Sequence, residues 1–351
     1  MTGAVPSALS TVAEPVERRL REVLDGERAR WEPVDPDMVA PLDSLTRFVL
    51  AGGKRLRPAF CHWAFVGAGG DPGQRSVVDA GAAFEMLHAF ALVHDDVMDG
   101  SATRRGAATV HVEFEALHDT SRWRGESRRF GEGVAILIGD LAEVYADRLM
   151  SATTPEAFAV WNELKIELNV GQYLDVLGTA RGGTDLATAR RIARYKSGKY
   201  TIVRPLHVGA ALAGRLDDLA EALSAYGEPL GEAFQLRDDI LGAFGDEALT
   251  GKPVGDDLLE GKPTPLLAIA NERADGAGAE LLARVGRPDL TTAEVAAIQD
   301  VLVACGARAE IEASIASLVD DAVGSLAGCA LGEPALQALH DLADYVAHRD
   351  R

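Results

Sequence analysis

The chain has few of the residues that mark secreted, zinc-binding or membrane-spanning proteins. Its three cysteines, Cys61, Cys305 and Cys329, lie far apart and show no CxxC spacing. We therefore expect reduced thiols in a cytoplasmic protein, with neither a disulfide framework nor a zinc site. The first residues lack a basic segment followed by an apolar one, and no apolar run approaches the roughly 20 residues that span a bilayer. We predict no signal sequence and no transmembrane segment.

Basic residues are also fewer than acidic ones. The chain has 35 Lys and Arg against 54 Asp and Glu, which gives a formal net charge of −19. Because neutralisation of phosphates drives binding to nucleic acids, we expect no nucleic-acid partner. Any anionic ligand must instead meet a local cluster of Lys and Arg, supported by a bound cation.

Strand patterns are missing as well. No short segment alternates cleanly between apolar and polar residues, whereas apolar residues recur at helical spacing throughout, for example in residues 16–31, 158–177 and 216–244. The pattern predicts an all-α protein, and we expect one large domain over residues 1–351. Residues 1–14 are a candidate disordered segment, and the Arg- and Gly-rich residues 113–133 are a candidate irregular insertion.

The most informative motif is Asp95-Asp96-Val97-Met98-Asp99, at the end of a strongly apolar stretch. If this stretch is helical, Asp95 and Asp99 lie four residues apart on one face, where their charges repel. A hard cation such as Mg²⁺, which takes a few carboxylate oxygens together with phosphates and water, would relieve that repulsion. Arg104 and Arg105 follow closely, and adjacent side chains that point apart would suit two different phosphate groups.

A second pair, Asp238-Asp239, also continues an apolar helical stretch. An isolated Asp pair is usually a solvated helix face, and Asp217-Asp218 is better explained as an acidic helix start. Burial of unpaired carboxylates is costly, so the two pairs in apolar settings need compensation. We expect them to face each other across a cavity and to share metal ions.

Basic residues with the right chemistry surround these motifs. Gly52 to Pro58 reads GGKRLRP, in which Lys54 and Arg57 would supply charged donors to phosphate. The alternative is a solvated basic run, and the spacing is not that of a P-loop. Four further candidates are unremarkable singly but follow in order: Lys196, Gln235, Lys252 and Lys262. His88 and His94 have no zinc spacing, and such residues are more often hydrogen-bonded core histidines.

Together these motifs resemble those of the trans-type polyprenyl diphosphate synthases, from about Asp43 to Thr264. The resemblance implies the all-α isoprenoid synthase fold, a helical bundle around a central cavity, and commonly a homodimer. It implies condensation of isopentenyl diphosphate with an allylic diphosphate, in which ionisation of the allylic diphosphate is assisted by three Mg²⁺ ions.

The resemblance also assigns roles to residues. Isopentenyl diphosphate would be held by Lys54, Arg57, His88 and Arg105. The metal ligands would be Asp95, Asp99 and Asp238, with Asp96 and Asp239 in support. The allylic diphosphate would be held by Arg104, Lys196, Gln235, Lys252 and Lys262. Catalysis would depend on the five carboxylates together with Arg104 and Lys196.

Two departures from the family pattern stand out. Gly242 occupies the position where the second acidic motif often has a third Asp, which puts a metal role of that position in doubt. Ser197 follows Lys196 where Thr is common, and it keeps the hydroxyl. Phe90 and Ala91, five and four residues before the first Asp, are one large and one small. This pair resembles the geranylgeranyl (C20) type, with a farnesyl or longer polyprenyl synthase as the alternative.

Two other functions compete with this reading. A class I terpene cyclase shares the fold and the first acidic motif, but it generally lacks the Gly52 to Pro58 loop and carries a different second metal motif. A non-catalytic subunit of a heteromeric prenyl synthase tends to lose acidic-motif carboxylates, and this chain keeps all five.

Overall fold

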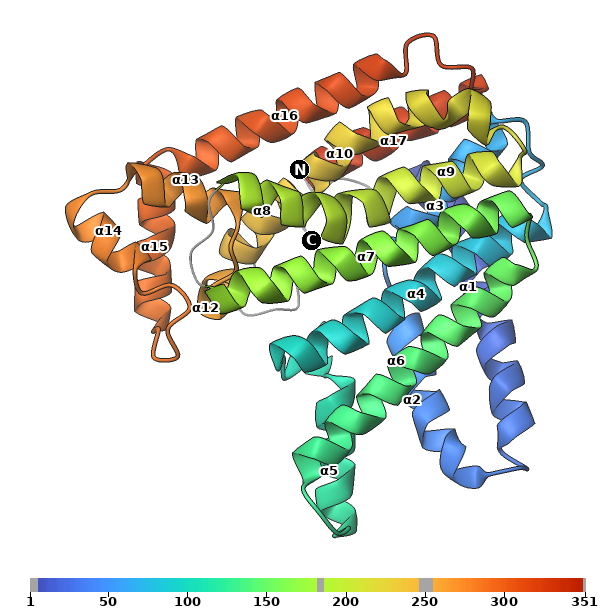
Figure 1. The fold of residues 1–351 in the computed structure, drawn as a ribbon, viewed down its shortest axis with the longest axis horizontal. Helices are drawn as coiled ribbons and strands as arrows, with labels where there is room; N and C mark the ends of the chain where they lie inside the picture. The colour runs from blue at the N-terminus through green and yellow to red at the C-terminus, as the bar shows by residue number, and fades with distance from the viewer. Residues whose placement is uncertain (1–5, 182–185, 246–254, 350–351) are drawn as a thin grey trace.

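Helices form nearly all the regular structure in residues 6–181, 186–245 and 255–349, the residues that the computed structural model describes (Figure 1). The first half comprises α1 (Ser7–Trp31), η1 (Pro36–Met38), α2 (Val39–Leu50), α3 (Leu56–Gly67), α4 (Arg75–Asp99), α5 (Val110–Ser121), α6 (Ser127–Ser151) and α7 (Pro155–Arg181). A two-stranded hairpin, β1 (Thr103–Arg104) and β2 (Ala107–Ala108), follows α4. The predicted all-α class is confirmed.

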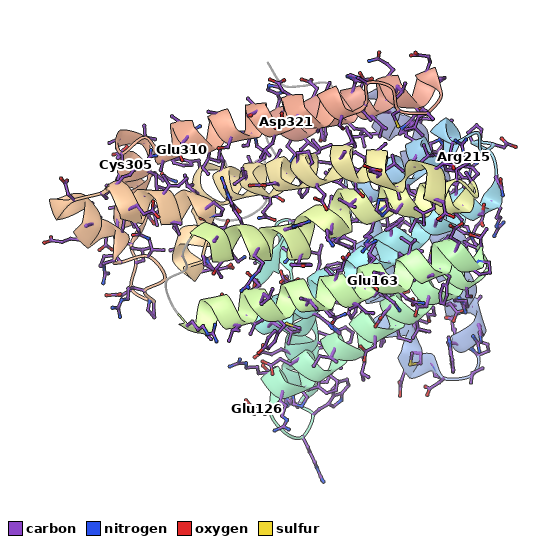
Figure 2. All side chains as sticks on the ribbon, turned by 45° about the horizontal axis from the view of Figure 1, so that its top comes forward. Glu126, Glu163, Arg215, Cys305, Glu310 and Asp321 are labelled. Carbon is purple, nitrogen blue, oxygen red and sulfur yellow. The ribbon has the colours of Figure 1, made fainter. Side chains whose placement is uncertain are left out.

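The second half continues the bundle. It comprises α8 (Leu186–Ala193), the π-helical segment η2 (Arg194–Val203), α9 (Arg204–Leu212), α10 (Leu216–Phe244), α12 (Asp256–Glu260), α13 (Pro265–Arg273), α14 (Gly276–Leu282), α15 (Thr292–Ala304), α16 (Ala307–Ser325) and α17 (Glu333–His348). Figure 2 shows Glu310 and Asp321 along α16, with Cys305 at its end next to α15. Helix α16 packs along α10, which places the second acidic stretch inside the bundle.

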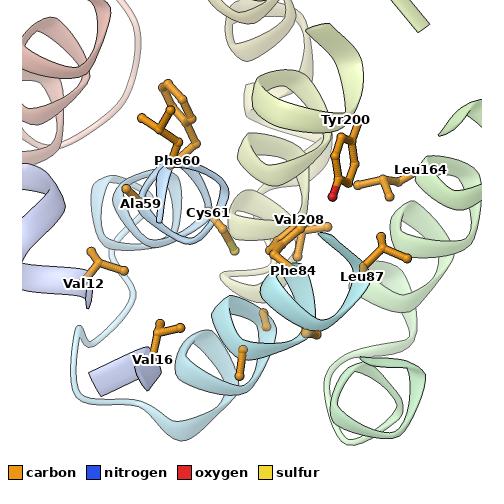
Figure 3. Packing of buried hydrophobic residues seen from close by; sticks show 14 of the residues in the cluster. Val12, Val16, Ala59, Phe60, Cys61, Phe84, Leu87, Leu164, Tyr200 and Val208 are labelled. Carbon is orange, nitrogen blue, oxygen red and sulfur yellow. The ribbon is translucent and has the colours of Figure 1, made fainter. Parts of the chain in front are cut away.

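Helix α4 is the central element of the larger core. It packs against α1, α3 and α6, and Phe84 meets Trp161 of α7 edge to face with ring centroids 5.4 Å apart. Figure 3 shows Phe84 and Leu87 among core residues from α1, α3 and α9. Within the described residues, α4 alone is long and apolar enough to cross a membrane, but 67% of its apolar window is buried inside the protein. We therefore assign α4 as a core helix.

A smaller apolar core lies at the other end of α10. Leu236 and Ile240 of α10 pack there with residues of α12, α13, α15 and α16. The N-terminal part of the same helix, including Leu223 and Tyr226, belongs to the larger core. Leu236 and Ile240 flank Asp238 and Asp239 in sequence, so the acidic motif is anchored in the smaller core.

Where η2 and α10 cross, glycines face each other and almost no side chain lies between the two backbones. A Cβ atom at Gly231 of α10 would lie 2.7 Å from the Gly198 Cα, so the two backbones are in direct contact. The π-helical geometry of η2 is uncommon and often occurs at functional sites. The crossing fixes the backbone that carries Lys196 against the helix that carries Gln235.

The prediction of an irregular insertion at residues 113–133 is wrong. Residues up to Ser121 lie in α5, and α6 begins at Ser127, so only the short connection between them is irregular. The two helices pack closely because Gly131 allows it: a Cβ there would lie 2.2 Å from the His111 carbonyl oxygen. Trp123 stacks edge-on against Phe130 and closes the tip of this helical hairpin.

The candidate disorder at residues 1–14 is also wrong for the part that the structure describes. Helix α1 begins at Ser7 and buries Ala8, Leu9 and Val12 in the core. The sequence before Pro15 carries these apolar residues at helical spacing, and tertiary packing, more than intrinsic propensity, stabilises such helices.

Candidate functional site

The first acidic motif lies in the last turn of α4. Gly100, with φ of 67°, ends the helix in the left-handed conformation. Asp95 accepts a hydrogen bond from the Gln172 amide of α7 at 2.9 Å. Asp96 is 1% exposed. Its Oδ1 lies 2.8 Å from Nε and 2.7 Å from Nη2 of the Arg104 guanidinium, with which it forms an ion pair. Burial raises the pKa of Asp96, although the Arg104 guanidinium opposes the shift.

The β1–β2 hairpin separates the two adjacent arginines. Arg105 and Gly106 have φ values of 54° and 74°, so both central residues of this two-residue turn are left-handed. As a result Arg104 points back to Asp96, whereas Arg105 Nη1 donates to the Gly52 carbonyl oxygen at 2.8 Å. The expectation that the two side chains point apart is confirmed.

The Gly52 to Pro58 loop is held in place by Arg55, which the sequence reasoning missed. The backbone of Arg55 adopts the left-handed conformation, with φ of 53°, and the residue is only 3% exposed. Its guanidinium forms a buried ion pair with Glu85 of α4 and donates to the Val49 carbonyl oxygen at 3.2 Å. The signal available in the sequence was Glu85 itself, a lone acid within an apolar stretch.

Arg57 belongs to a cluster of polar side chains beside the core. Its guanidinium lies 4.2 Å from the centre of the Tyr200 ring and donates to the Thr201 hydroxyl at 3.0 Å. His88 lies nearby, with its ring centre 6.2 Å from that of Tyr200. Burial and the neighbouring arginines lower the pKa of His88 well below its usual range, so the imidazole is neutral at neutral pH. Lys54 lies 5.5 Å from the ring centre of Tyr345 on α17.

The second acidic motif lies near the C-terminal end of α10. Asp238 pairs with Nη2 of Arg349 at 2.6 Å, and Arg349 also donates to the Phe234 carbonyl oxygen. Asp239 is 3% exposed and accepts a hydrogen bond from Gln235 at 2.8 Å. Its Oδ2 makes no hydrogen bond to any described residue. Burial raises the pKa of Asp239 well above its usual range.

Lys262 connects the two halves of the site. Its ammonium pairs with Glu260 at 2.6 Å and lies 3.7 Å from Asp99 of the first motif. It also lies 3.8 Å from Asp257 of α12. The segment after the second motif therefore reaches the end of α4, as expected if the two motifs serve one site.

Gly242 lies directly against Asp257. A Cβ at Gly242 would lie 1.8 Å from the Asp257 Oδ2 and 2.3 Å from its Cγ. No side chain at position 242 is compatible with the present position of this carboxylate. Sequence reasoning noted Gly242 as a departure but did not identify Asp257.

The remaining predicted residues are placed as follows. Phe90 packs edge-on against His94 with ring centroids 4.7 Å apart, and Ala91 is partly buried against the main core. Lys196 and Ser197 lie on the backbone of η2, and their side chains are outside the described set. Lys252 lies outside the described residues.

The donors of this site fit a hard divalent cation that shares its ligands with phosphate. Among the described residues, no group of three or more His, Cys, Asp or Glu side chains is arranged to hold a metal. Mg²⁺ commonly uses one or two carboxylates plus phosphate oxygens and water, so a full protein cage is not needed. The orphaned Oδ2 of buried Asp239 and the carboxylates of Asp95, Asp99 and Asp238 supply such oxygens.

One other pocket, of about 560 Å³, lies between α8, η2, α10 and α16. Arginines line it, but two of them are already paired within the protein: Arg190 with Glu232 at 3.2 Å and Arg194 with Glu228 at 2.9 Å. Among the predicted site residues whose side chains the structure describes, none lines this pocket.

Comparison with known proteins agrees with this geometry. The polyprenyl synthetase family profile matches residues 40–302. A geranylgeranyl diphosphate synthase of Mycobacterium tuberculosis is 37% identical over 249 residues, which cover 69% of this chain and 65% of that protein. A nonaprenyl diphosphate synthase of the same organism is 31% identical, over 94% of this chain and 91% of that protein.

Similarity extends to three dimensions. The crystal structure of a geranylgeranyl pyrophosphate synthase from Corynebacterium glutamicum, complexed with isoprenyl diphosphate and magnesium, matches with a TM-score of 0.92. The two sequences are 37% identical, and the match covers 97% of this chain and 99% of that one.

The buried carboxylate of Asp239 should reduce stability at neutral pH. Above the ordinary carboxyl pKa, near 3.9, the unfolded state ionises freely while the folded state resists ionisation. The free energy of unfolding then falls with rising pH until the raised folded pKa is passed. We expect Asp239→Asn to stabilise the metal-free protein by about 1–3 kcal/mol at pH 8.

Thermal unfolding in EDTA at pH 4 and pH 8 measures this effect. The increase in unfolding temperature should shrink toward zero at pH 4. The control Asp119→Asn, which alters an exposed residue, should show no increase at either pH. A lower unfolding temperature for Asp239→Asn at pH 8 would contradict the prediction.

Proposed function

The chain belongs to the polyprenyl synthetase family of prenyltransferases, and from this premise we propose that it condenses isopentenyl diphosphate with an allylic diphosphate in a Mg²⁺-dependent reaction. The observation that carries the proposal is the position of Lys262. This residue follows the second acidic motif yet lies 3.7 Å from Asp99 of the first. Two carboxylate motifs and a set of basic side chains thus converge on one region.

The metal-facing half of the proposed site consists of Asp95, Asp99 and Asp238, with Asp96 and Asp239 behind them. When bound, Mg²⁺ would neutralise the allylic diphosphate as it leaves, which lowers the barrier to ionisation. Asp96 orients Arg104 because its carboxylate accepts from Nε and contacts Nη2 of the guanidinium. Arg104 would thereby present its remaining donors to the same diphosphate, together with Lys262, Lys196, Gln235 and Lys252.

The second substrate would bind beside the Gly52 to Pro58 loop. Arg105 bonds to Gly52 in this loop, and Arg57 is oriented by Tyr200 and Thr201. With Lys54 they supply three cations for the diphosphate of isopentenyl diphosphate. His88 is neutral, so it would donate a hydrogen bond without adding a further charge. No side-chain nucleophile is required, because the isopentenyl double bond would attack the allylic cation left when diphosphate departs. The new cation would then lose a proton to the released diphosphate.

The proposed product is geranylgeranyl diphosphate. Relatives named for products of different length match this chain, so the proposal rests on Phe90 and Ala91. Phe90 lies on α4 above the first motif and packs against His94, which bonds to the Ile136 carbonyl oxygen at 3.0 Å. A ring braced in this way is suited to limit the length of a growing chain.

We also propose a cytoplasmic location. The three cysteines are free, and burial raises the pKa of the Cys61 thiol, which keeps it protonated. Reduced thiols of this kind are typical of a reducing compartment.

Product analysis tests the function directly. Purified protein is incubated with isopentenyl diphosphate and each of the C5, C10 and C15 allylic diphosphates, with Mg²⁺ or with EDTA. We expect a C20 diphosphate that forms only with Mg²⁺. Hydrocarbon or alcohol from an allylic diphosphate alone would indicate a terpene cyclase, and no product under any condition would indicate a subunit that needs a partner.

The chain-length proposal has its own test. Phe90→Ala should lengthen the products of the same assay beyond C20, because the ring proposed to limit chain length is removed. Phe158→Ala, a partly buried phenylalanine of α7, serves as the control and should leave product length unchanged. An unaltered product distribution for Phe90→Ala would show that another residue sets the length.

A homodimer is proposed through the outer faces of α6 and α7. Large apolar side chains are exposed there, including Leu137 at 63%, Val144 at 59%, Ile166 at 59% and Tyr173 at 66%. On α7, Ile166, Val170 and Tyr173 recur at the spacing of one helix face. An apolar patch of this kind marks an interaction surface, and a second copy is the occupant that the family resemblance favours.

Light scattering after gel filtration tests the dimer. The wild type should have twice the mass of the 37.2 kDa chain, and Leu137→Asp combined with Tyr173→Asp should reduce it to a monomer. Val303→Asp alters an equally apolar residue, 53% exposed, outside this face and should leave the dimer intact. A wild-type monomer at micromolar concentration would exclude the proposal.

A further inference from the structure

We propose that the pocket between α8, η2, α10 and α16 binds an organic diphosphate, that is, a diphosphate group joined to an apolar or aromatic moiety (Figure 1). Its volume of about 560 Å³ is within the range of small-molecule sites and exceeds what a free phosphate ion needs. The described side chains that are proposed to bind the substrates do not line it. The pocket would thus be a second anion site.

Positive charge predominates in the lining of this pocket. Four basic and two acidic residues line it: Arg190, Arg191, Arg194, Lys199, Glu228 and Glu232. Four positive charges against two negative ones leave an excess of two, in a chain whose net charge is −19. Arg191 forms no ion pair with any residue that the structure describes. A local excess of this kind, in an otherwise acidic protein, favours an anionic ligand.

The ion pairs of the other two arginines leave them available to such a ligand. Arg190 lies 3.2 Å from Glu232, and 47% of the arginine side chain is exposed. Arg194 lies 2.9 Å from Glu228, with 55% exposed. Exposed pairs contribute only about 0–1 kcal/mol to stability. A diphosphate carries more negative charge than one carboxylate and accepts from a guanidinium through two oxygens, so it can draw these arginines toward itself.

The rest of the lining suits the apolar moiety. Tyr195, Val203, Pro229 and Leu318 line the pocket beside the basic residues. The Lys199 ammonium lies 5.3 Å from the centre of the Tyr195 ring. A flat ring or a hydrocarbon chain can pack on this surface, whereas a bare pyrophosphate ion would leave it unused. The lining therefore favours an organic diphosphate over an inorganic one.

Local structure explains only part of this arrangement. Arg190 and Arg191 lie in the last turn of α8, where the helix dipole favours basic residues. Lys199 pairs with Glu167 of α7, which also pairs with Arg204. Neither interaction accounts for the cavity that these side chains surround.

The segment η2 joins this pocket to the proposed catalytic site. Gly198 lines the pocket and contacts Gly231 of α10, and Lys196 lies on the same segment. A ligand bound beside Gly198 would hold η2 in one position against α10. We therefore expect occupancy of the pocket to change the KM for the allylic diphosphate. This expectation rests on the proposed function, whereas binding to the pocket does not.

Equilibrium dialysis in EDTA tests the site with ADP, geranylgeranyl diphosphate and inorganic pyrophosphate. At least one of the two organic diphosphates should bind the wild type about tenfold more tightly than pyrophosphate, because its apolar moiety is buried. The tighter of the two distinguishes a nucleotide from a prenyl ligand. Arg191→Glu should weaken that binding about tenfold or more. Arg287→Glu, the same change at an exposed residue outside the pocket, should match the wild type.

Three results would contradict the inference or its consequence. Wild-type affinity for all three probes in a folded Arg191→Glu protein would overturn the site, and pyrophosphate as the tightest ligand would overturn the organic moiety. In steady-state assays, the tighter probe should change the KM for the allylic diphosphate more in the wild type than in Arg191→Glu. An equal change in both proteins would overturn the link through η2. Absence of product in the wild type would overturn the proposed function but leave the dialysis result standing.

Discussion

Charge balance among partly buried carboxylates is the constraint on which the rest of the site depends. Asp96 pairs with Arg104, Asp238 with Arg349, and Asp99 lies near Lys262. An unpaired buried carboxylate costs several kcal/mol, and a basic residue from another element offsets this cost for Asp96, whereas buried Asp239 is bonded among the described residues to the Gln235 amide. These pairs join α4 to the β1–β2 hairpin and to the segment after α12, and they join α10 to the residue that follows α17.

The same pairing explains how an acidic protein can recognise anions. A net charge of −19 would repel a diphosphate at long range, and only local groups of cations offset it. Arg57 and Arg105 lie on the side of the Gly52 to Pro58 loop, whereas Arg104 and Lys262 lie beside the acidic motifs. Two cationic regions therefore flank His88 and the end of α4, in keeping with two diphosphate substrates.

Sequence reasoning identified the helical class and the residues that carry recognisable chemistry. The acidic motifs, the arginine pair and the glycine-rich loop were readable because each combines unusual residue types at short spacing. Arg55 and Asp257 were not, since their importance comes from a left-handed backbone and from contact with Gly242. The helical hairpin of α5 and α6 was predicted to be irregular because residues 113–133 are charged and rich in Arg and Gly, whereas Gly131 in fact permits close helix packing.

The glycine contact between η2 and α10 has a consequence for how this sequence can diverge. Since the Gly231 Cβ position would lie 2.7 Å from the Gly198 Cα, either residue can change only if the helix axes separate. Separation would alter the distance between the backbone of Lys196 and the turn that bears Gln235. Selection at these two positions therefore acts on the spacing between the two backbones. Keeping both glycines preserves the geometry of the site, although neither glycine contributes a side chain to it.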